Sequence, residues 1–157
     1  MSKIRPLTRK NLNEAVALAN SVFPDEEEEP PSLELPAGLY PENYKDFLAK
    51  TKMSDIKYWV ALDESGEVVG TIGLYCYEFD KKEACWLGWF CVKPSSRRNG
   101  VGAELLSFAI AKAIKRKKAF LRLWTSANLQ EAVKLYIRFG FVLTKEEFPK
   151  LYYELKL

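Results

Sequence analysis

The sequence contains no histidine among its 157 residues. Imidazole is the side chain that most often acts as a general base, activates serine and cysteine nucleophiles and binds zinc near neutral pH. Its absence excludes Ser-His-Asp and Cys-His catalysis as well as histidine-based zinc sites. Any chemistry must therefore depend on carboxylates, tyrosine, lysine, backbone amides or a bound cofactor, and we predict no metal site.

Cysteine and long apolar runs are also scarce. Cys76, Cys85 and Cys91 lie in strand-like apolar stretches without a C-x-x-C pair, which indicates buried thiols rather than a disulfide or zinc framework. No apolar run reaches about 18 residues, and no basic-then-apolar leader begins the chain. We therefore expect neither a membrane span nor a secretory signal, and a cytoplasmic location.

An excess of one sign of charge is missing too. The 24 Lys and Arg residues against 21 Asp and Glu leave a net charge of +3, which creates no overall field for nucleic acid or membrane. The basic run KRKK at 115–118 ends a predicted helix, where cations complement the negative end of the helix dipole. We expect no nucleic-acid or membrane partner. The length and the hydrophobic content of 48% fit one domain over residues 1–157.

Hydrophobic periodicity predicts strands alternating with helices. The expected strands are 3–7, 57–62, 68–78, 84–92, 119–125, 141–144 and 151–157, and the expected helices begin at Leu12 and span 42–50, 100–118 and 130–138. Asn11 and Glu14 predict a capping box for the first helix. Residues 24–41 (PDEEEEPPSLELPAGLYP) are rich in proline and glutamate, which predicts a long loop that acts as a lid or substrate lip.

Residues 95–106 (SSRRNGVGAELL) place two arginines and two glycines at the start of a predicted helix. Amides at a helix N-terminus bind phosphate, and glycines let the backbone approach an anion closely. A P-loop is excluded because no Lys-Ser/Thr pair follows, and Leu105 replaces the third glycine of G-x-G-x-x-G. The stretch therefore indicates a phosphate site, with a glycine turn between solvated arginines as the alternative.

At this point the chain resembles the GNAT family of N-acetyltransferases. The family's pyrophosphate loop has the pattern Q/R-x-x-G-x-G/A after the fourth strand, and residues 97–102 (RRNGVG) match each fixed position. Residues 127–141 (ANLQEAVKLYIRFGF) are similar to the family's helix with its Leu-Tyr pair and terminal Gly-Phe. The resemblance implies an α/β (α+β) GNAT fold. Its central, mixed, mostly antiparallel sheet has about six to seven strands, is flanked by about four helices and is splayed between strands 4 and 5.

The resemblance also implies acetyl-CoA as cosubstrate. Its pyrophosphate would lie on the loop, and its pantetheine arm would pair with the fourth strand, where open amides can also form an oxyanion hole. The implied loop residues are Arg97, Arg98, Asn99, Gly100, Val101, Gly102 and Ala103, and the implied strand residues are Phe90, Cys91 and Val92. The family's CoA-contacting Asn falls on Asn128 or Leu129, because Asn128 stands eight positions before Tyr136 instead of the usual seven.

Acetyl transfer needs a proton for the leaving thiolate and a neutral amine. The resemblance assigns the first task to Tyr136, whose phenol has an ordinary pKa of about 10, although a core tyrosine is the alternative. The strand-four glutamate of lysine-directed relatives corresponds to Trp86, which could line an acceptor site or pack in the core. Glu83 and Glu78 are the remaining candidates for a base acting through water, and either could simply solvate a hairpin.

We therefore predict an acetyl-CoA-dependent N-acetyltransferase that acts on a primary amine of a small molecule or peptide by direct transfer in a ternary complex. The alternative is a catalytically weak CoA-binding sensor or scaffold, because the strand-four base is missing. The acidic run at 25–29 suggests a cationic acceptor such as a polyamine or basic peptide, with a solvated loop as the alternative. The identity of the acceptor and the oligomeric state, including a homodimer, stay open.

Overall fold

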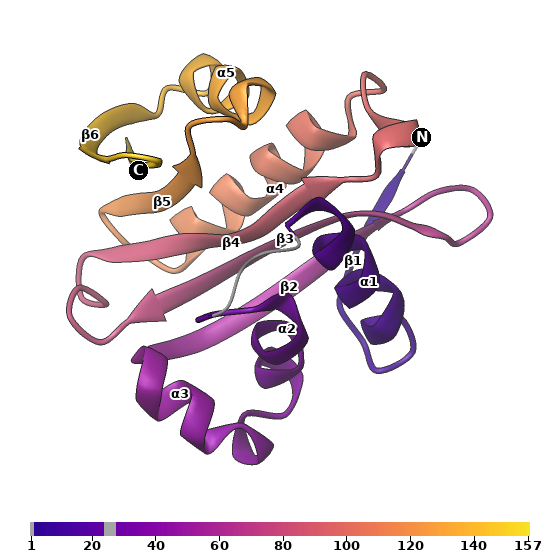
Figure 1. The fold of residues 1–157 in the computed structure, drawn as a ribbon, viewed down its shortest axis with the longest axis horizontal. Coiled ribbons are helices and arrows are strands. Elements are labelled where there is room, and N and C mark those ends of the chain that lie inside the picture. Colours follow the sequence, from indigo (N-terminus) through magenta and orange to yellow (C-terminus); the bar gives the residue numbers. More distant parts are fainter. Residues whose placement is uncertain (1, 24–27) are drawn as a thin grey trace.

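The structure is a computed structural model that describes residues 2–23 and 28–157. The described residues form a seven-stranded sheet in the order β1-β2-β3-β4-β5-β7-β6 (Figure 1). The strands are β1 (Lys3–Pro6), β2 (Met53–Leu62), β3 (Val68–Tyr77), β4 (Ala84–Val92), β5 (Phe120–Ser126), β6 (Val142–Glu147) and β7 (Lys150–Lys156). All neighbours pair antiparallel except β4 and β5, which are parallel. The predicted mixed, mostly antiparallel sheet is confirmed.

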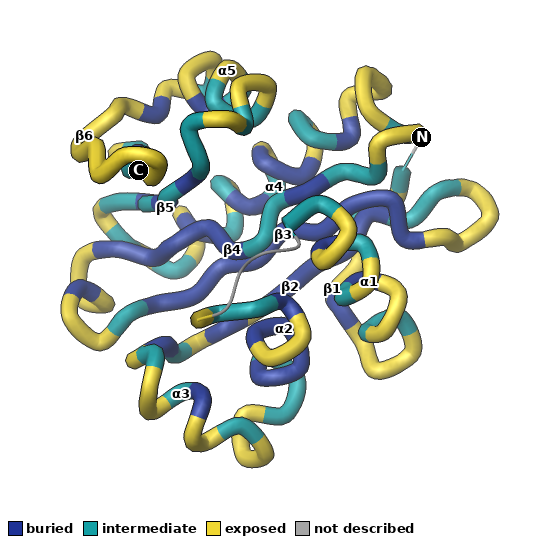
Figure 2. The backbone as a smooth tube through the Cα atoms, viewed as in Figure 1, coloured by how far each residue is buried: buried dark blue, intermediate teal, exposed yellow. Residues whose placement is uncertain are grey.

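Helices cover both faces of this sheet. They are α1 (Leu12–Val22), α2 (Pro31–Leu39), α3 (Lys45–Thr51), α4 (Val101–Lys115) and α5 (Gln130–Arg138). Buried side chains of α1, α2 and α3 pack with one face of the central strands, and those of α4 and α5 pack with the other. Figure 2 shows the central strands buried along most of their length, whereas β6 is exposed. None of the helices in the described ranges is long and apolar enough to cross a membrane.

The prediction of one continuous loop over 24–41 is wrong, because residues 31–39 form α2. Pro31 stands at the first helical position, where its missing N–H leaves no hydrogen bond unmade. Leu35 is fully buried, and its packing stabilises a helix that the proline content alone disfavours. The described residues therefore form five α-helices rather than about four. Residues 24–27 of the predicted loop lie outside the described part of the chain.

The predicted capping box of α1 is also wrong. Asn11 Oδ1 accepts a hydrogen bond from Thr8 N at 2.8 Å, and Glu14 Oε2 accepts one from Val68 N at 2.8 Å. Glu14 therefore connects α1 to the start of β3 instead of closing its own helix. Tertiary contact has replaced the local interaction that the spacing suggested.

The three cysteines are free, buried thiols in the sheet, as predicted. Burial raises the pKa of Cys85 and of Cys91 to about 11. Both thiols are therefore protonated at neutral pH, and we assign them a structural role.

Candidate active site

A cavity lies where β4 and β5 separate. The two strands are in register from Ala84 opposite Phe120 to Trp86 opposite Arg122, and then they diverge. The cavity of about 550 Å³ is lined by residues 87–90 of β4, residues 123–126 of β5 and side chains from both helical layers. This opening confirms the splay predicted between strands 4 and 5.

The edge of β4 at this cavity carries a β-bulge. Thr71 stands opposite Cys91 and Gly73 opposite Gly88, so β4 has one more residue than β3 between the two pairs. Thr71 Oγ1 donates a hydrogen bond to the carbonyl oxygen of Trp89 at 2.7 Å and holds the bulge from inside the sheet. A bulge re-aims backbone groups that would otherwise join the ladder, and amides aimed at a reacting carbonyl can stabilise an oxyanion.

The predicted phosphate loop connects β4 to α4. Arg98 and Gly100 have positive φ angles of 70° and 81°, and Gly100 is the N-cap of α4. Consecutive amides in such a turn form a concave surface that suits an anion, next to the positive end of the helix dipole. Arg97 Nε donates a hydrogen bond to the Val92 carbonyl oxygen at 3.1 Å and fastens the loop to the end of β4.

The remaining loop residues follow this turn. Asn99 and Val101 border a second cavity, and Ala103 lies in the first turn of α4. A Cβ on Gly102 would lie 3.6 Å from Phe90 Cζ and 3.7 Å from Val92 Cγ2, which are ordinary van der Waals distances. A methyl group therefore fits at Gly102, whereas a long side chain would occupy space beside the β4 edge.

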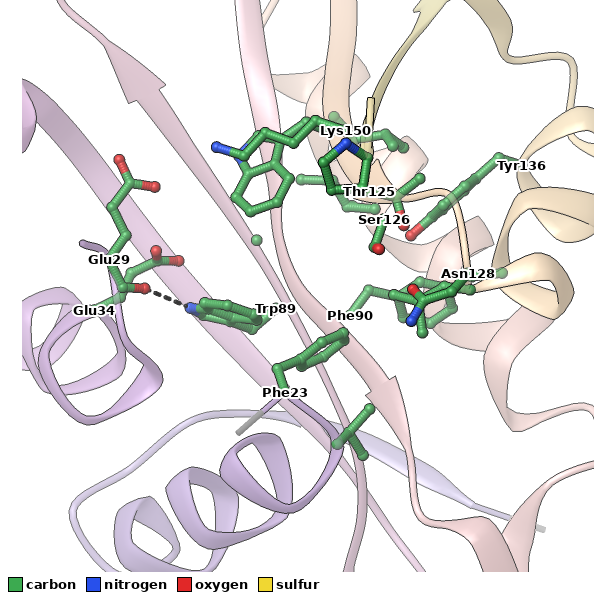
Figure 3. A pocket seen from close by; sticks show the side chains of 18 of the residues that line it. Phe23, Glu29, Glu34, Trp89, Phe90, Thr125, Ser126, Asn128, Tyr136 and Lys150 are labelled. Carbon is green, nitrogen blue, oxygen red and sulfur yellow. Dashed lines mark hydrogen bonds between the residues drawn. The ribbon is translucent and has the colours of Figure 1, made fainter. Parts of the chain in front are cut away.

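Tyr136 of α5 lies on the wall of the main cavity and is 5% exposed. Its ring packs against Phe90 and Phe141, with centroids 6.1 and 5.6 Å away. Burial, and next the neighbouring Cys91, raise the pKa of Tyr136 above its ordinary value, so the phenol holds its proton at neutral pH. Its hydroxyl points into the cavity on the side of Ser126 (Figure 3).

Both candidates for the family's Asn position, Asn128 and Leu129, line the cavity just before α5. Phe90 lines it from β4, and the buried Cys91 contacts Thr71 with an S–O distance of 3.1 Å. The structure therefore brings Phe90, Asn128 and Leu129 to one opening, whereas Cys91 and Val92 are not among the described residues that line it.

The two predicted base candidates lie at the other end of β4. Glu78 pairs with Lys81 at 3.0 Å and Glu83 with Arg122 at 3.1 Å, and neither belongs to the described residues that line the cavity. Trp86 is buried and donates its indole N–H to Asp80 Oδ2 at 2.9 Å, which matches the core alternative for this residue. The structure does not bring these carboxylates to Tyr136.

Two other glutamates line the cavity. Glu34 of α2 is 2% exposed and accepts a hydrogen bond from the Tyr58 hydroxyl. Glu29 accepts one from the Tyr77 hydroxyl at 2.9 Å, and its carbonyl oxygen accepts the indole N–H of Trp89 at 3.1 Å. Figure 3 shows both glutamates on one side of the cavity and the labelled tyrosine of α5 on the other.

Glu29 belongs to the acidic run that suggested a cationic acceptor, whereas Glu34 was missed because its segment was expected to be a loop. A usable signal lay elsewhere in the sequence. Gly73 and Gly88 interrupt two apolar strands, and a glycine inside a strand often marks the close approach of another group. Tyr58 and Glu34 make that approach.

Aromatic rings also line the cavity. Phe23 and Trp89 pack with their ring centroids 4.9 Å apart, and Lys150 Nζ lies 4.2 Å from the Trp124 ring centroid. Aromatic faces attract cations, and their area suits an apolar body. Among the described residues, no group of three or more His, Cys, Asp or Glu could hold a metal ion.

Comparison with known proteins identifies the class. A family model described as an acetyltransferase (GNAT) domain matches residues 54–143, which include β4, the loop and α5. The chain belongs to the GNAT acetyltransferases, and the resemblance found in the loop and in α5 is confirmed. A GNAT-family acetyltransferase from Staphylococcus aureus Mu50 has the same fold, with a TM-score of 0.78, 20% identity and coverage of 100% of this chain and 99% of that one.

Two sequence relatives are named N-acetyltransferases. An aminoalkylphosphonate N-acetyltransferase from Salmonella typhimurium is 30% identical over 66% of this chain and 68% of its own length. An uncharacterized N-acetyltransferase from Methanocaldococcus jannaschii is 30% identical over 49% of this chain and 35% of its own length. The match with the second relative thus spans about a third of that protein.

Proposed function

We propose that the protein transfers the acetyl group of acetyl-CoA to a primary amine in the cavity between β4 and β5. One observation carries this proposal: the cavity is lined by a protonated phenol on one side and by two carboxylates on the other. Acetyl transfer to an amine needs a proton donor for the departing sulfur and a group that accepts a proton from the nucleophile.

The residues present fit acetyl-CoA. The amides at the start of α4 and the charges of Arg97 and Arg98 suit its pyrophosphate, and the β4 edge from Phe90 to Val92 suits its pantetheine arm. Asn128, or Leu129 beside it, would contact the arm from the α5 side. When bound, acetyl-CoA supplies an acetyl group activated as a thioester.

The chain's own groups would then divide the work. Amides at the β4 bulge would stabilise negative charge on the carbonyl oxygen. Tyr136 holds a proton at its phenol oxygen and would give it to the sulfur. The side of the cavity formed by α1 and α2 would bind the amine, because α2 supplies Glu34 and the segment just before α2 supplies Glu29.

The acceptor we propose is a small, cationic primary amine. Two carboxylates on one wall favour an ammonium group, and the aromatic rings beside them favour an attached apolar part. The Salmonella relative is named for an aminoalkylphosphonate, which supports a small molecule rather than a protein as acceptor.

The test is amine-dependent release of CoA. The protein is mixed with acetyl-CoA and with phenethylamine, putrescine or a lysine-containing peptide. The release of free thiol is followed over time, and the mass of the amine product is measured by mass spectrometry. We expect thiol release coupled to acetylation of at least one small amine. Tight binding of acetyl-CoA without release in the presence of any of these amines would favour the sensor or scaffold instead.

A further inference from the structure

Tyr58, Gly73 and Gly88 lie in one row across three strands. Tyr58 of β2 stands opposite Gly73 of β3, which stands opposite Gly88 of β4. A Cβ on Gly73 would overlap the Tyr58 ring, and a Cβ on Gly88 would overlap its hydroxyl oxygen. The Tyr58 side chain therefore lies across the sheet over both glycines, and its hydroxyl reaches β4.

The row ends at the cavity, because β4 has no β5 residue in register beyond Trp86 within the described ladder. There the Tyr58 hydroxyl donates to Glu34 Oε2, and a Cβ on Gly88 would lie 2.9 Å from the same oxygen. Burial, and then the Glu34 charge, raise the pKa of Tyr58 well above its ordinary value. Tyr58 is thus a permanent donor that fixes the Glu34 carboxylate in place.

Glu34 and Tyr136 approach the cavity from opposite faces of the sheet. Glu34 extends from α2, whereas Tyr136 extends from α5 and packs with the core under α4. A carboxylate oxygen pair has about four lone-pair positions, so one carboxylate can accept hydrogen bonds from a tyrosine hydroxyl and from an ammonium group together. A proton acceptor and a proton donor can therefore face one acetyl group from two sides.

Resting on the proposed N-acetyltransferase function, we propose that Glu34 binds the ammonium group of the acceptor and takes its proton. We assign Tyr58 as the positioning residue for Glu34. The acceptor is a small primary amine with an apolar or aromatic body, because Phe23 and Trp89 pack together in the same cavity and Trp89 contacts Glu29.

The protons balance in this scheme. Glu34 takes one proton from R–NH₃⁺, and the resulting R–NH₂ forms the C–N bond as the C–S bond breaks. Tyr136 protonates the sulfur, and the second proton lost by the nitrogen restores the phenol. The proton on Glu34 passes to solvent, so the products are the acetylated amine, CoA and one proton.

The first test measures binding rather than turnover. Phenethylamine is titrated calorimetrically into the CoA complexes of the wild type, Glu34→Gln and Tyr58→Phe, with phenethyl alcohol as the uncharged control. We expect Glu34→Gln to weaken amine binding by at least about tenfold, as for a lost charged contact, without changing the affinity for the alcohol or for acetyl-CoA. Equal amine affinity in wild type and Glu34→Gln, or no binding to the wild type, would overturn the proposal.

The second test is the pH profile of kcat/KM for phenethylamine. In Glu34→Gln only amine already neutral in solution reacts, so kcat/KM should rise about tenfold per pH unit from pH 7 to 9, given an amine pKa of about 10.4. The wild type should rise less steeply, and Tyr58→Phe should lose part of its kcat/KM for the amine while its KM for acetyl-CoA stays unchanged. If the pH profiles of wild type and Glu34→Gln run parallel and both proteins bind acetyl-CoA normally, Glu34 does not take the proton of the amine. A wild type that does not bind acetyl-CoA would refute the proposed function itself.

Discussion

The two ends of the β4–β5 pair differ in what surrounds their polar groups: ion pairs close one end, and a cavity opens at the other. At the closed end, Arg122 contacts Asp80 at 2.8 Å, Glu83 at 3.1 Å and Glu154 at 2.7 Å. Asp80 also accepts the indole N–H of Trp86, so one guanidinium and one indole connect the β3–β4 turn to β5 and β7. These charged groups contact one another within the protein.

At the open end, the polar groups line a cavity, and Glu34 and Glu29 also accept hydrogen bonds from Tyr58 and Tyr77. Tyr136 and Glu34 come from different helical layers, and the bulge of β4 points backbone groups away from a regular ladder. Their partners in acetyl transfer would be atoms of the two substrates. We infer from this difference that the closed end stabilises the fold and the open end carries the activity. Substitutions at the closed end should therefore lower stability, and those at the open end should lower activity.

The largest effect is expected for Tyr136→Phe, which tests the open end. The variant should keep its affinity for acetyl-CoA while kcat falls about 10²-fold or more, the usual scale of a general acid. Because burial raises the pKa of Tyr136 above its ordinary value of about 10, loss of this proton should not lower the wild-type kcat below about pH 10. Steady-state kinetics between pH 6 and 10 measures the fall in kcat and its pH dependence. Wild-type turnover in the variant would show that Tyr136 only packs in the core.

Arg122→Gln tests the closed end. Removing the cation leaves Asp80, whose side chain is 5% exposed, without its ionic partner, and we expect a loss of about 2–3 kcal/mol of unfolding free energy. Urea denaturation measures this loss, and Lys134→Gln is the matched control because the Lys134–Glu131 pair is exposed and should contribute nothing measurable. Acetyl-CoA affinity should be unchanged in folded Arg122→Gln. A large loss of affinity with unchanged stability would contradict the separation of tasks.

Gly88→Ala tests whether the open end depends on the row of glycines. The added Cβ would displace the Tyr58 hydroxyl and Glu34, and such misplacement should lower kcat/KM for the amine by about tenfold or more. Gly102→Ala is the control, because its Cβ meets only ordinary contacts. If both variants have the wild-type kcat/KM for the amine, the Tyr58–Glu34 pair does not position the acceptor.

The smallest effect is expected for Thr71→Val, which removes the hydroxyl that holds the bulge. The Trp89 carbonyl oxygen would lose its 2.7 Å partner, at a cost of about 1 kcal/mol. We expect a few-fold rise in the KM for acetyl-CoA with kcat nearly unchanged, measured by steady-state kinetics. An unchanged KM would show that the β4 ladder alone holds the bulge.

Local motifs explain which parts of the site could be predicted. The loop at 97–102 and the helix that carries Tyr136 combine residue types at short, fixed spacings, so the sequence alone located them. The order of strands and helices along the chain followed from hydrophobic periodicity in the same way. These features depend on neighbours along the chain.

The Tyr58–Glu34 pair could not be predicted because it depends on four separate segments, α2, β2, β3 and β4. The two residues are 24 positions apart, and they meet only because Gly73 and Gly88 leave room across the sheet. Packing of Leu35 against the core also forms α2 in a stretch whose prolines indicated a loop. Tertiary structure thus brings to the cavity a carboxylate that no motif in the sequence indicated.

The central claim is that the opening between β4 and β5, with the loop before α4, binds acetyl-CoA. Calorimetric titration of acetyl-CoA into the wild type, Gly102→Ala and Gly102→Glu tests it most directly, with circular dichroism to verify folding. We predict equal affinity for the wild type and Gly102→Ala, and at least about 10²-fold weaker binding for Gly102→Glu, whose carboxylate would place negative charge at the anion site and bulk beside Phe90. Wild-type affinity in a folded Gly102→Glu variant would contradict the claim.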